Sequence, residues 1–598
     1  MKKTIYLLSV LVLLAACNDD FMNRHPRTEI GVERFFNTEE DLKMYIYGLY
    51  NFPGHGTYAA DGGTDNQATT SGAVEIKNIM AAANPSSSTV TSGWSWDRLR
   101  SINLFLANVG RADVAPDVKA HYEGLARFFR ARFYVDKVKR YSDVPWYENV
   151  IETNDDEALF KTRDSRDLVI QKIFEDYQFA AENVKTDQPA GALDKWGVLT
   201  YMSRDALYEG TFRKYHNELG LASTANTYLQ MARDAAKRIM DSKEFTLHTT
   251  GKPGEDYLAI FRSGDLSTNP EIILATYYDP KEVTAGTSEW NFGNYEPSPA
   301  KDLVLSYLMK DGSFYSSQSG YRTKPFVDEF QNRDPRLSQT YAYPGWELIQ
   351  TATYVSGAGI YIQQFNKNFT GYHLIKGFVN NKEADVYNDL DYPVLRYAEV
   401  LLNYAEAKAE LNEFTQTDAE LSVNLLRRRA GMPDFNMNPG TEPLSVAKFG
   451  NISALLHEIR RERRVELAFE GFRYDDLMRW NAGKVLEKIP EGLYFPSLGK
   501  FDLTGDGVED IYLIPSSGSI PADADKEVNS KGVKLVYYRT GGIDDSNATV
   551  YLSNGTSGTI VTTKSMGTFV EPKYYYRPVP VQQITLNPAL GPQLFGWE

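Results

Sequence analysis

Hydrophobic positions three and four residues apart recur over much of the chain and predict a mainly helical protein. The first such run, residues 39–50, follows Thr38 and three acidic residues, which together are typical of a capped helix start. Because short connections join several runs, we expect antiparallel helix pairs. Further helices are predicted at 96–109, 121–141, 165–183, 195–212, 225–241, 394–411 and 418–430.

The stretch 458–480 has the same spacing but carries more charge than a simple surface helix would. Placed on one helix, four of its charged residues form a continuous stripe: Arg463, Glu466, Glu470 and Arg473. Apolar residues crowd the remaining circumference, and Trp480 closes the stretch. Because a helix that is apolar around much of its girth is usually buried, we expect these charges to form a structural network inside the protein.

Three parts of the chain lack a helical period. Residues 51–92 predict a long irregular segment, and such loops are often functional. Residues 251–384 predict loops with short strands, residues 495–563 predict turns and hairpins, and the Pro-rich tail predicts an extended end. We therefore expect one unit, 17–598, with a helical part at 18–240 that includes a binding loop at 51–96, an irregular ligand-binding part at 251–384 and a C-terminal part at 385–598.

Composition narrows the classes of function. With 598 residues, 42% of them hydrophobic and 24% charged, the chain is typical of an ordinary globular protein. A formal charge of −15 argues against nucleic acid as a partner, because that affinity depends on clustered Lys and Arg. Aromatic residues reach 13%, and their rings pack in cores but also stack on flat ligands and sugar rings.

The N-terminus has the pattern of an export signal. Lys2 and Lys3 precede an apolar run at 5–16 that is too short to span a bilayer, and the run ends at Cys17, the only Cys in the chain. The residues 14–17 resemble a bacterial lipobox, which implies removal of a signal peptide at 1–16 and lipidation of Cys17. The acidic residues that follow resemble a signal for the outer face of the outer membrane, so we expect attachment through the lipid anchor only. A plain signal peptide with a chance Cys is the alternative.

Several ordered motifs together resemble the SusD/RagB family of outer-membrane nutrient-binding lipoproteins. After the lipobox come SGWSWDRLRSINLFLANV, GLARFFRARFYVDKVKRYSDVP, NRDPRL, LRYAEVLLNYAEAKAEL, RRERRVELAFEGFRYDDLMRW and RPVPVQQITLNPALGPQLFGW. The resemblance implies a mainly α fold in which four tetratricopeptide-like helix pairs form a scaffold beside a loop-rich part with short β-hairpins. It also implies a partner, a SusC-like TonB-dependent transporter barrel, over which the lipoprotein closes as a lid.

Two acidic residues of the charged stretch, Glu466 and Glu470, have a spacing that a glycosidase pair could use. The neighbouring arginines argue against this, because they would hold both groups ionised whereas a general acid needs a raised pKa. These arginines are Arg463, Arg464, Arg473 and Arg479. We therefore favour structural ion pairing and predict no catalytic residue. The seven His residues are dispersed without metal-ligand spacing.

A segment rich in Asp and Gly at 501–510 resembles a short calcium loop. Oxygen ligands are available at four positions: Asp502, Thr504, Asp506 and Asp510. The bidentate Glu of an EF-hand is missing, because Leu513 stands at the twelfth position. A simple turn is the alternative interpretation, and apart from this calcium site we predict no cofactor.

Ligand contacts are sought among aromatic residues in loops, since rings with regular helical spacing are more often core. Trp96 is in step with Leu99 and is therefore expected to be core. Exposed rings could stack on sugars while Asp and Asn bond to hydroxyl groups, and the alternative is that these loops pack on the scaffold or the transporter. The candidate ligand-binding residues are Asp65, Asn66, Trp94, Trp290, Phe292, Tyr295 and Trp346.

The leading hypothesis is therefore a non-catalytic surface lipoprotein that binds oligosaccharides and delivers them to its transporter. One alternative is a protein of the same family that binds peptides or another nutrient. The alternative from a different class is an enzyme that acts on surface polysaccharide.

Overall fold

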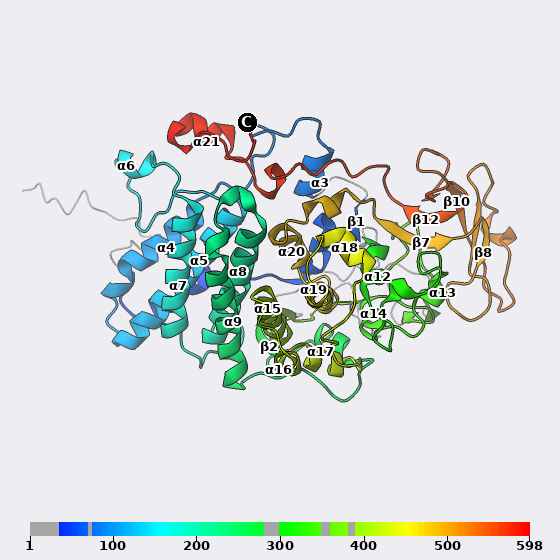
Figure 1. Cartoon of the computed structure of the whole chain (residues 1–598), viewed down its shortest axis with the longest axis horizontal. Helices are drawn as coiled ribbons and strands as arrows, with labels where there is room; N and C mark the ends of the chain where they lie inside the picture. The colour runs from blue at the N-terminus through cyan, green and yellow to red at the C-terminus, as the bar shows by residue number, and fades with distance from the viewer. Residues whose placement is uncertain are drawn as a thin grey trace, which may run out of the picture.

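Helices are the main regular structure of the molecule, and the strands formed by residues 491–561 gather at one end of it (Figure 1). The computed structural model describes residues 35–69, 74–279, 281, 298–348, 359–378, 380 and 389–598. The longer helices are α2 (Glu39–Gly48), α4 (Asp97–Asn108), α5 (Pro116–Tyr141), α7 (Arg166–Asn183), α8 (Lys195–Tyr215), α9 (Ala225–Ser242), α15 (Tyr397–Glu410) and α19 (Ala454–Glu466). The shorter ones are α3 (Glu75–Ala81), α6 (Asp156–Leu159), α10 (Asp256–Ile260), α12 (Lys301–Ser306), α13 (Phe326–Glu329), α14 (Arg336–Thr340), α16 (Gln416–Leu421), α17 (Val423–Arg429), α18 (Pro443–Phe449), α20 (Arg473–Arg479) and α21 (Val581–Leu586).

The predicted mainly helical fold is confirmed. The expected cap of the first helix is a capping box, in which the Asp41 N–H donates to Thr38 Oγ1 and the Thr38 N–H donates to Asp41 Oδ2. Helices close in sequence lie side by side, with α5 against α7 and α8 against α9 (Figure 1). This packing is compatible with tetratricopeptide-like pairs, while their number stays a prediction.

Two predicted helices are broken in the structure. The run 418–430 forms α16 and α17, with the break at Ser422. The stretch 458–480 forms α19 and α20, so the expectation of one helix with one charged stripe is wrong. Between them Phe469 and Gly471 have φ of 61° and 80°, and a Cβ on Gly471 would lie 2.8 Å from Thr57 Cγ2.

Side chains from elsewhere in the chain satisfy the backbone of this break. The Phe469 N–H donates to Asp61 Oδ2 (3.3 Å), and Lys376 Nζ donates to the Ala468 carbonyl (2.8 Å). The Glu466 carbonyl accepts hydrogen bonds from the Tyr257 hydroxyl and from Arg396. These tertiary contacts replace helical hydrogen bonds, which explains why the local pattern of the sequence did not reveal the break.

The charges of this stretch are buried and paired with partners from distant elements. Glu466 Oε1 accepts from Arg396 (2.7 Å) and Arg429 (2.5 Å), and Glu466 Oε2 accepts from Arg336 (3.0 Å). Burial alone would raise the pKa of Glu466, but the three arginines hold it well below its ordinary value. Other pairs include Glu470 with Arg396 and Lys376, Arg473 with Asp65, the Trp480 indole N–H with Glu406 and, within the stretch itself, Arg463 with Asp476.

Strands pair within the irregular parts. A four-stranded sheet has the order β11 (Val550–Tyr551), β10 (Val536–Gly541), β9 (Ile511–Pro515) and β8 (Gly499–Phe501). Only β8 and β9 form the expected antiparallel hairpin in this sheet, because β10 runs parallel to both of its neighbours. The other pairs are antiparallel: β1 (Gln67–Ala68) with β3 (Ser298–Pro299), β2 (Ile272–Thr276) with β6 (Tyr392–Arg396), β4 (Glu347–Leu348) with β5 (Gly359–Ile360), and β7 (Glu491–Phe495) with β12 (Gly558–Val561).

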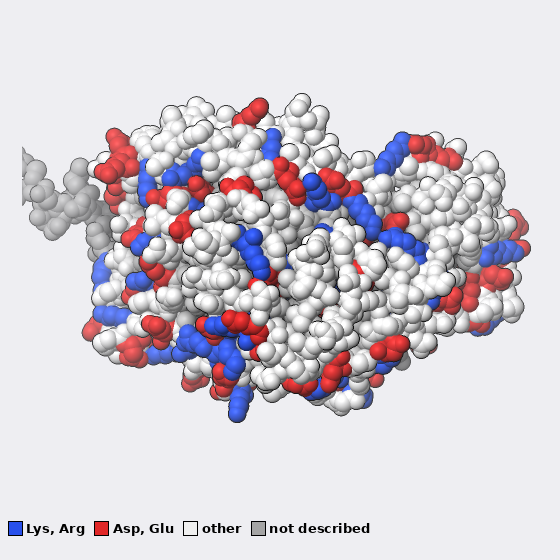
Figure 2. Space-filling model, viewed as in Figure 1, with Lys and Arg blue, Asp and Glu red and all other residues white. Residues whose placement is uncertain are grey.

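Two features concern the surface. Figure 2 shows acidic and basic side chains interspersed on one face, so the net charge of −15 is not collected into a single acidic region there. Among the described residues, no helix combines the length and the apolar character that crossing a membrane requires.

The tail, expected to be extended, contains the helix α21.

The Glu470→Gln variant should be less stable than the wild type by about 3 kcal/mol, because it leaves Arg396 and Lys376 partly uncompensated in the core. Urea denaturation at neutral pH measures this change in the free energy of unfolding. The Glu420→Gln variant, which alters an exposed ion pair with Arg428, is the matched control and should unfold like the wild type. An unchanged unfolding midpoint for Glu470→Gln would contradict the role of this network.

The free energy of unfolding should fall as the pH is lowered from about 4.5 to about 2. Burial would raise the pKa of Glu462 and Glu406, but their arginine partners lower both from 4.5 to about 2. A carboxylate with a depressed pKa in the folded state stabilises the protein fully above the unfolded value of the pKa, and this contribution is lost as the pH falls through the folded value. Urea denaturation at several pH values tests the prediction. Equal stability at neutral pH and at about pH 2 would refute it.

Candidate functional site

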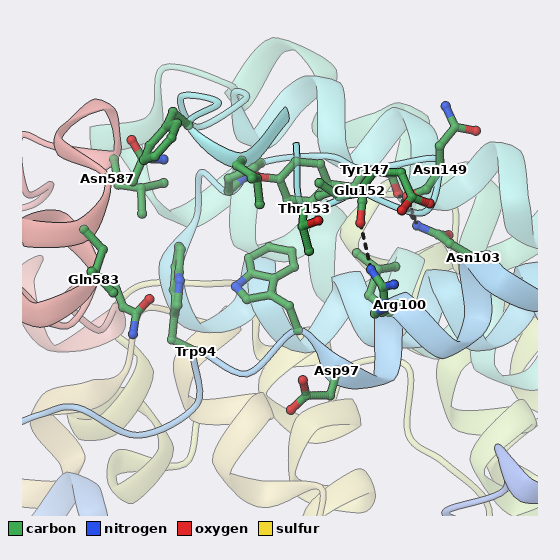
Figure 3. Close-up of a pocket in the computed structure, with 18 residues that line it drawn as sticks. Trp94, Asp97, Arg100, Asn103, Tyr147, Asn149, Glu152, Thr153, Gln583 and Asn587 are labelled. Atoms are coloured by element: carbon green, nitrogen blue, oxygen red, sulfur yellow. Dashed lines mark hydrogen bonds between the residues drawn. The ribbon is translucent and has the colours of Figure 1, made fainter. Parts of the chain in front are cut away.

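A cavity of about 570 Å³ lies where the start of α4, the segment after α5 and the C-terminal tail meet (Figure 3). Segments that are nearly 500 residues apart in sequence therefore line the same cavity. The lining residues comprise aromatic rings, amide side chains and an aliphatic rim: Trp94, Trp96, Asp97, Leu99, Arg100, Asn103, Pro145, Tyr147, Asn149, Ile151, Glu152, Thr153, Leu159, Phe160, Gln583, Leu586, Asn587 and Leu590.

Helix α5 fixes the loop that carries Trp94. Lys137 Nζ, on α5, donates to the carbonyls of Gly93 (2.5 Å) and Ser95 (2.6 Å), on either side of this tryptophan. Gly93 has a φ of 93°, and a Cβ at this position would lie 2.6 Å from Arg140 Nε. A glycine is therefore needed for the loop to approach α5 this closely.

Three rings line the cavity in edge-to-face contact. Trp94 and Trp96 have ring centroids 5.4 Å apart, and Trp96 and Tyr147 have centroids 5.7 Å apart. Both tryptophans are half-buried, so each is held by the protein while part of it stays accessible. Burial and then Asp164 raise the pKa of Tyr147 to about 12, so its hydroxyl remains protonated at neutral pH.

Polar side chains come from one face of α4. Asp97, Arg100 and Asn103 are three residues apart on this helix and line the cavity, and Figure 3 shows Arg100 and Asn103 pointing toward the segment that carries Tyr147 and Glu152. Arg100 Nη1 donates to the Ile151 carbonyl (2.7 Å), and Asn103 Nδ2 donates to the carbonyls of Tyr147 (3.0 Å) and Asn149. Asn103 Oδ1 is buried and has no hydrogen-bond partner in the described structure.

The tail closes the other side. Asn587 Nδ2 donates to the Lys161 carbonyl (3.0 Å), and Thr162 Oγ1 donates to the Ala589 carbonyl (3.1 Å), so the segment after α21 is tied to the segment after α6. The rim there is apolar and accessible, with Phe160 53% and Leu586 63% exposed. Rings, amides and an apolar rim together suit a ligand that has both apolar faces and hydrogen-bonding groups.

Trp94 is the predicted ligand-binding residue that the structure places in this cavity. The expectation for Asp65 and Asn66 is wrong, because Asn66 is buried and the carboxylate of the half-buried Asp65 is only 6% exposed. Asp65 pairs with Arg473 (2.7 Å) and Arg464 (3.0 Å), and Asn66 bonds to Asp61 and to Arg464. In a core rich in arginine, the carboxylate and the amide serve as structural partners and are not exposed to a ligand.

Trp346 was also expected to bind ligand, and this expectation is wrong. Its side chain is only 5% exposed and packs against the rings of Tyr361 and Phe378. The other three predicted residues, Trp290, Phe292 and Tyr295, lie outside the described residues.

The predicted binding loop, 51–96, and the predicted irregular part, 251–384, meet in the structure. Strand β1 pairs with β3, with Gln67 opposite Pro299, and the Ala300 N–H donates to the Asn66 carbonyl (2.8 Å). The ion pairs of Asp65 lie directly beside this junction.

Sequence reasoning missed most of the cavity. Trp96 was assigned to the core, yet it lines the cavity, and the pair Trp94 and Trp96 around one Ser was the available signal. Nothing in the local sequence marked Tyr147, Gln583 or Asn587, because their role depends on the long-range approach of the tail.

The proposed calcium loop is organised by its own backbone. Asp502 accepts hydrogen bonds from the N–H groups of Thr504, Gly505 and Gly507, and Asp510 accepts from those of Leu503 and Thr504. Asp506 pairs with Lys531 (2.5 Å). The described part of the chain contains no group of three or more His, Cys, Asp or Glu residues placed to hold a metal ion. These bonds favour the turn interpretation, and calcium binding stays an untested prediction.

The fold and cavity define a mainly helical protein with a preformed ligand-sized cavity at the edge of its scaffold. A model of the SusD family matches residues 262–597, more than half of the chain, and the chain therefore belongs to this family, as the sequence motifs predicted. It is 25% identical over 496 residues to SusD-like protein P38 of Formosa agariphila, covering 80% of this chain and 91% of that protein. It is 24% identical over 549 residues to SusD-like protein P2 of the same organism, covering 87% and 97%.

Solved structures share the fold. A SusD-like protein from Bacteroides fragilis superimposes with a TM-score of 0.66 at 20% identity, covering 96% of this chain and 100% of that chain. A SusD-like carbohydrate-binding protein from the same species gives a TM-score of 0.64 at 22% identity, covering 93% and 100%. At these identities the likeness is one of fold.

Proposed function

We propose that this protein is a non-catalytic, cell-surface lipoprotein that binds oligosaccharides and delivers them to a SusC-like TonB-dependent transporter in the outer membrane. The observation that carries the proposal is the cavity at Trp94, which combines two half-buried tryptophans with amide groups. Membership of the SusD family supports it, and one structural relative is described as carbohydrate-binding.

The chemistry of the cavity suits sugars. The apolar face of a pyranose ring can stack on Trp94 or Trp96, while its hydroxyl groups can exchange hydrogen bonds with the Tyr147 hydroxyl and the Gln583 amide. About 570 Å³ is the size of a site for a short oligosaccharide segment. The open rim lets a longer chain continue past the site.

A catalytic role for the charged stretch is disfavoured by its burial. Burial would raise the pKa of Glu470, but Arg396 and Lys376 lower it, so the carboxyl group stays ionised and cannot act as a general acid at neutral pH. Glu466 is fully buried and equally committed to arginines. Neither group lines the cavity at Trp94.

The Trp94→Ala variant should bind oligosaccharide about tenfold more weakly than the wild type, because it removes a stacking surface. Calorimetry against plant, host and microbial oligosaccharides, beside a panel of peptides, measures the affinity. Trp196→Ala, which removes a half-buried tryptophan on α8 outside the cavity, is the matched control.

Three results of this experiment would count against the proposal. Binding of peptides without binding of any glycan would favour the alternative that the protein captures peptides. Release of shortened products from a bound glycan would favour an enzyme. Equal glycan affinity of Trp94→Ala and the wild type would show that the cavity at Trp94 is not the glycan-binding site.

The anchor and the partner can be tested together. An affinity-tagged full chain, purified from detergent-solubilised outer membranes, should bring with it a TonB-dependent transporter identified by mass spectrometry. The Cys17→Ser variant should carry no lipid and should no longer be found in the membrane fraction. Recovery of the wild-type chain without any such transporter would contradict the delivery step.

A further inference from the structure

A second cavity, of about 850 Å³, lies at the strand-rich end of the molecule, between residues 360–366 and the segment that leads into β10. Its walls carry six aliphatic side chains: Leu348, Ile360, Ile362, Ile520, Val533 and Val536. Ile360, Ile520 and Val533 are 45%, 42% and 46% exposed, so a well-exposed aliphatic rim surrounds the opening.

Two tyrosines of this cavity differ from the accessible rings at Trp94, because they are buried and their hydroxyl groups make hydrogen bonds within the protein. Tyr361 is buried with its hydroxyl against His373, and Tyr538 is buried with its hydroxyl bonded to residues 363 and 365. The accessible surface is mainly branched aliphatic, which fits the side chains of a polypeptide better than the flat face of a sugar.

An unpaired strand edge runs beside the cavity. Strand β5 pairs with β4 so that Ile360 lies opposite Glu347, and the Tyr361 N–H donates to the Trp346 carbonyl (2.9 Å). Successive residues of a strand direct their N–H and C=O groups to opposite sides. The backbone N–H and C=O groups of Tyr361 therefore point toward β4, whereas those of Ile360 and Ile362 point away from it.

The chain continues beyond β5 to Gln364, whose carbonyl accepts hydrogen bonds from Lys367 and Asn368 in the turn that begins at Phe365. Burial alternates along residues 360–365, and the Tyr538 hydroxyl bonds to the Gln363 carbonyl (3.4 Å) and the Phe365 N–H (3.2 Å), on the side that Tyr361 uses. On the opposite side, the backbone of Ile362 and the N–H of Gln364 make no hydrogen bond within the described chain. Such an edge is a template for another strand.

We propose that this edge binds an extended, internal segment of a partner protein, which adds as a strand beside residues 360–364. Backbone hydrogen bonds would come from Ile362 and Gln364. Every second side chain of the added segment would lie on the face of Ile360 and Ile362 and would enter the cavity. This site is independent of the oligosaccharide site, which lies among α4, α6 and α21.

The charges of the cavity indicate an internal segment. Its two lysines are already paired, Lys531 with Asp506 (2.5 Å) and Lys534 with Asp523 (2.7 Å). The carboxylate of Asp510 accepts from two backbone N–H groups. Among the described lining residues, no lysine is left to neutralise a free C-terminal carboxylate, so a segment within a longer chain fits better than a short free peptide.

The test uses a fluorescent, acetylated and amidated peptide of sequence KVTVTVK as the probe and the full chain as the receptor. We expect saturable binding in fluorescence anisotropy, together with slower hydrogen exchange at the amides of Ile362 and Gln364. A probe with N-methyl groups on alternate residues, which removes the donors of its pairing edge, should not bind. Equal binding of both probes, or no saturable binding up to about 1 mM, would overturn the proposal.

Variants locate the binding on the protein. Ile360→Lys and Val533→Lys place a charge on the exposed rim and should each weaken binding of the probe about tenfold, with an unchanged melting temperature. Val570→Lys, at a residue that is 41% exposed and outside this cavity, is the matched control.

Two results with these variants would overturn the proposal. If both rim variants bound the peptide probe as tightly as the wild type does, the strand edge at residues 360–364 would be excluded as the binding site. Self-association of the chain that Ile360→Lys abolishes would assign the edge to a second copy in place of a different partner. Oligosaccharide affinity should stay unchanged in Ile360→Lys, so failure of this proposal is distinguishable from failure of the glycan proposal.

Discussion

The pairing of Glu466 with three arginines is the interaction on which the rest of the structure depends. Arg336 comes from α14, Arg396 from the end of β6 and Arg429 from the end of α17, so one carboxylate on α19 connects four elements. Charges are costly to bury, and they remain in a core only when their partners are held in place. The requirement for compensation therefore fixes the irregular part of the chain against the helical scaffold.

The same requirement separates rigid loops from accessible ones. Asp65 looked like a ligand contact in sequence, but its pairing with Arg473 and Arg464 makes it part of the scaffold. Trp94 is held differently, through backbone carbonyls that Lys137 binds on both sides, which leaves the indole itself accessible. The protein thus uses buried ion pairs to hold its frame and backbone hydrogen bonds to present its rings.

Sequence patterns predicted the helices well where local periodicity and capping decide the outcome, as at Thr38. They failed at the break between α19 and α20, where Phe469 adopts a positive φ. Its N–H donates to Asp61, and the adjacent Ala468 carbonyl accepts from Lys376, so residues distant in sequence stabilise this conformation. They also failed to distinguish Trp346 from Trp94. Both follow turn-forming residues, and only long-range packing buries the first and exposes the second.

By itself, the sequence determined the mainly helical fold, the family and the presence of a paired charge cluster, because each depends on residue spacing and ordered motifs within short stretches. The tertiary structure alone decided which rings are accessible and where cavities form. The cavity at Trp94 requires residues 94–160 to meet residues 583–590. The strand edge at Ile362 exists because the backbone of this residue makes no hydrogen bond with the part of the chain that the structure describes. Both are properties of how distant segments meet, which no local pattern records.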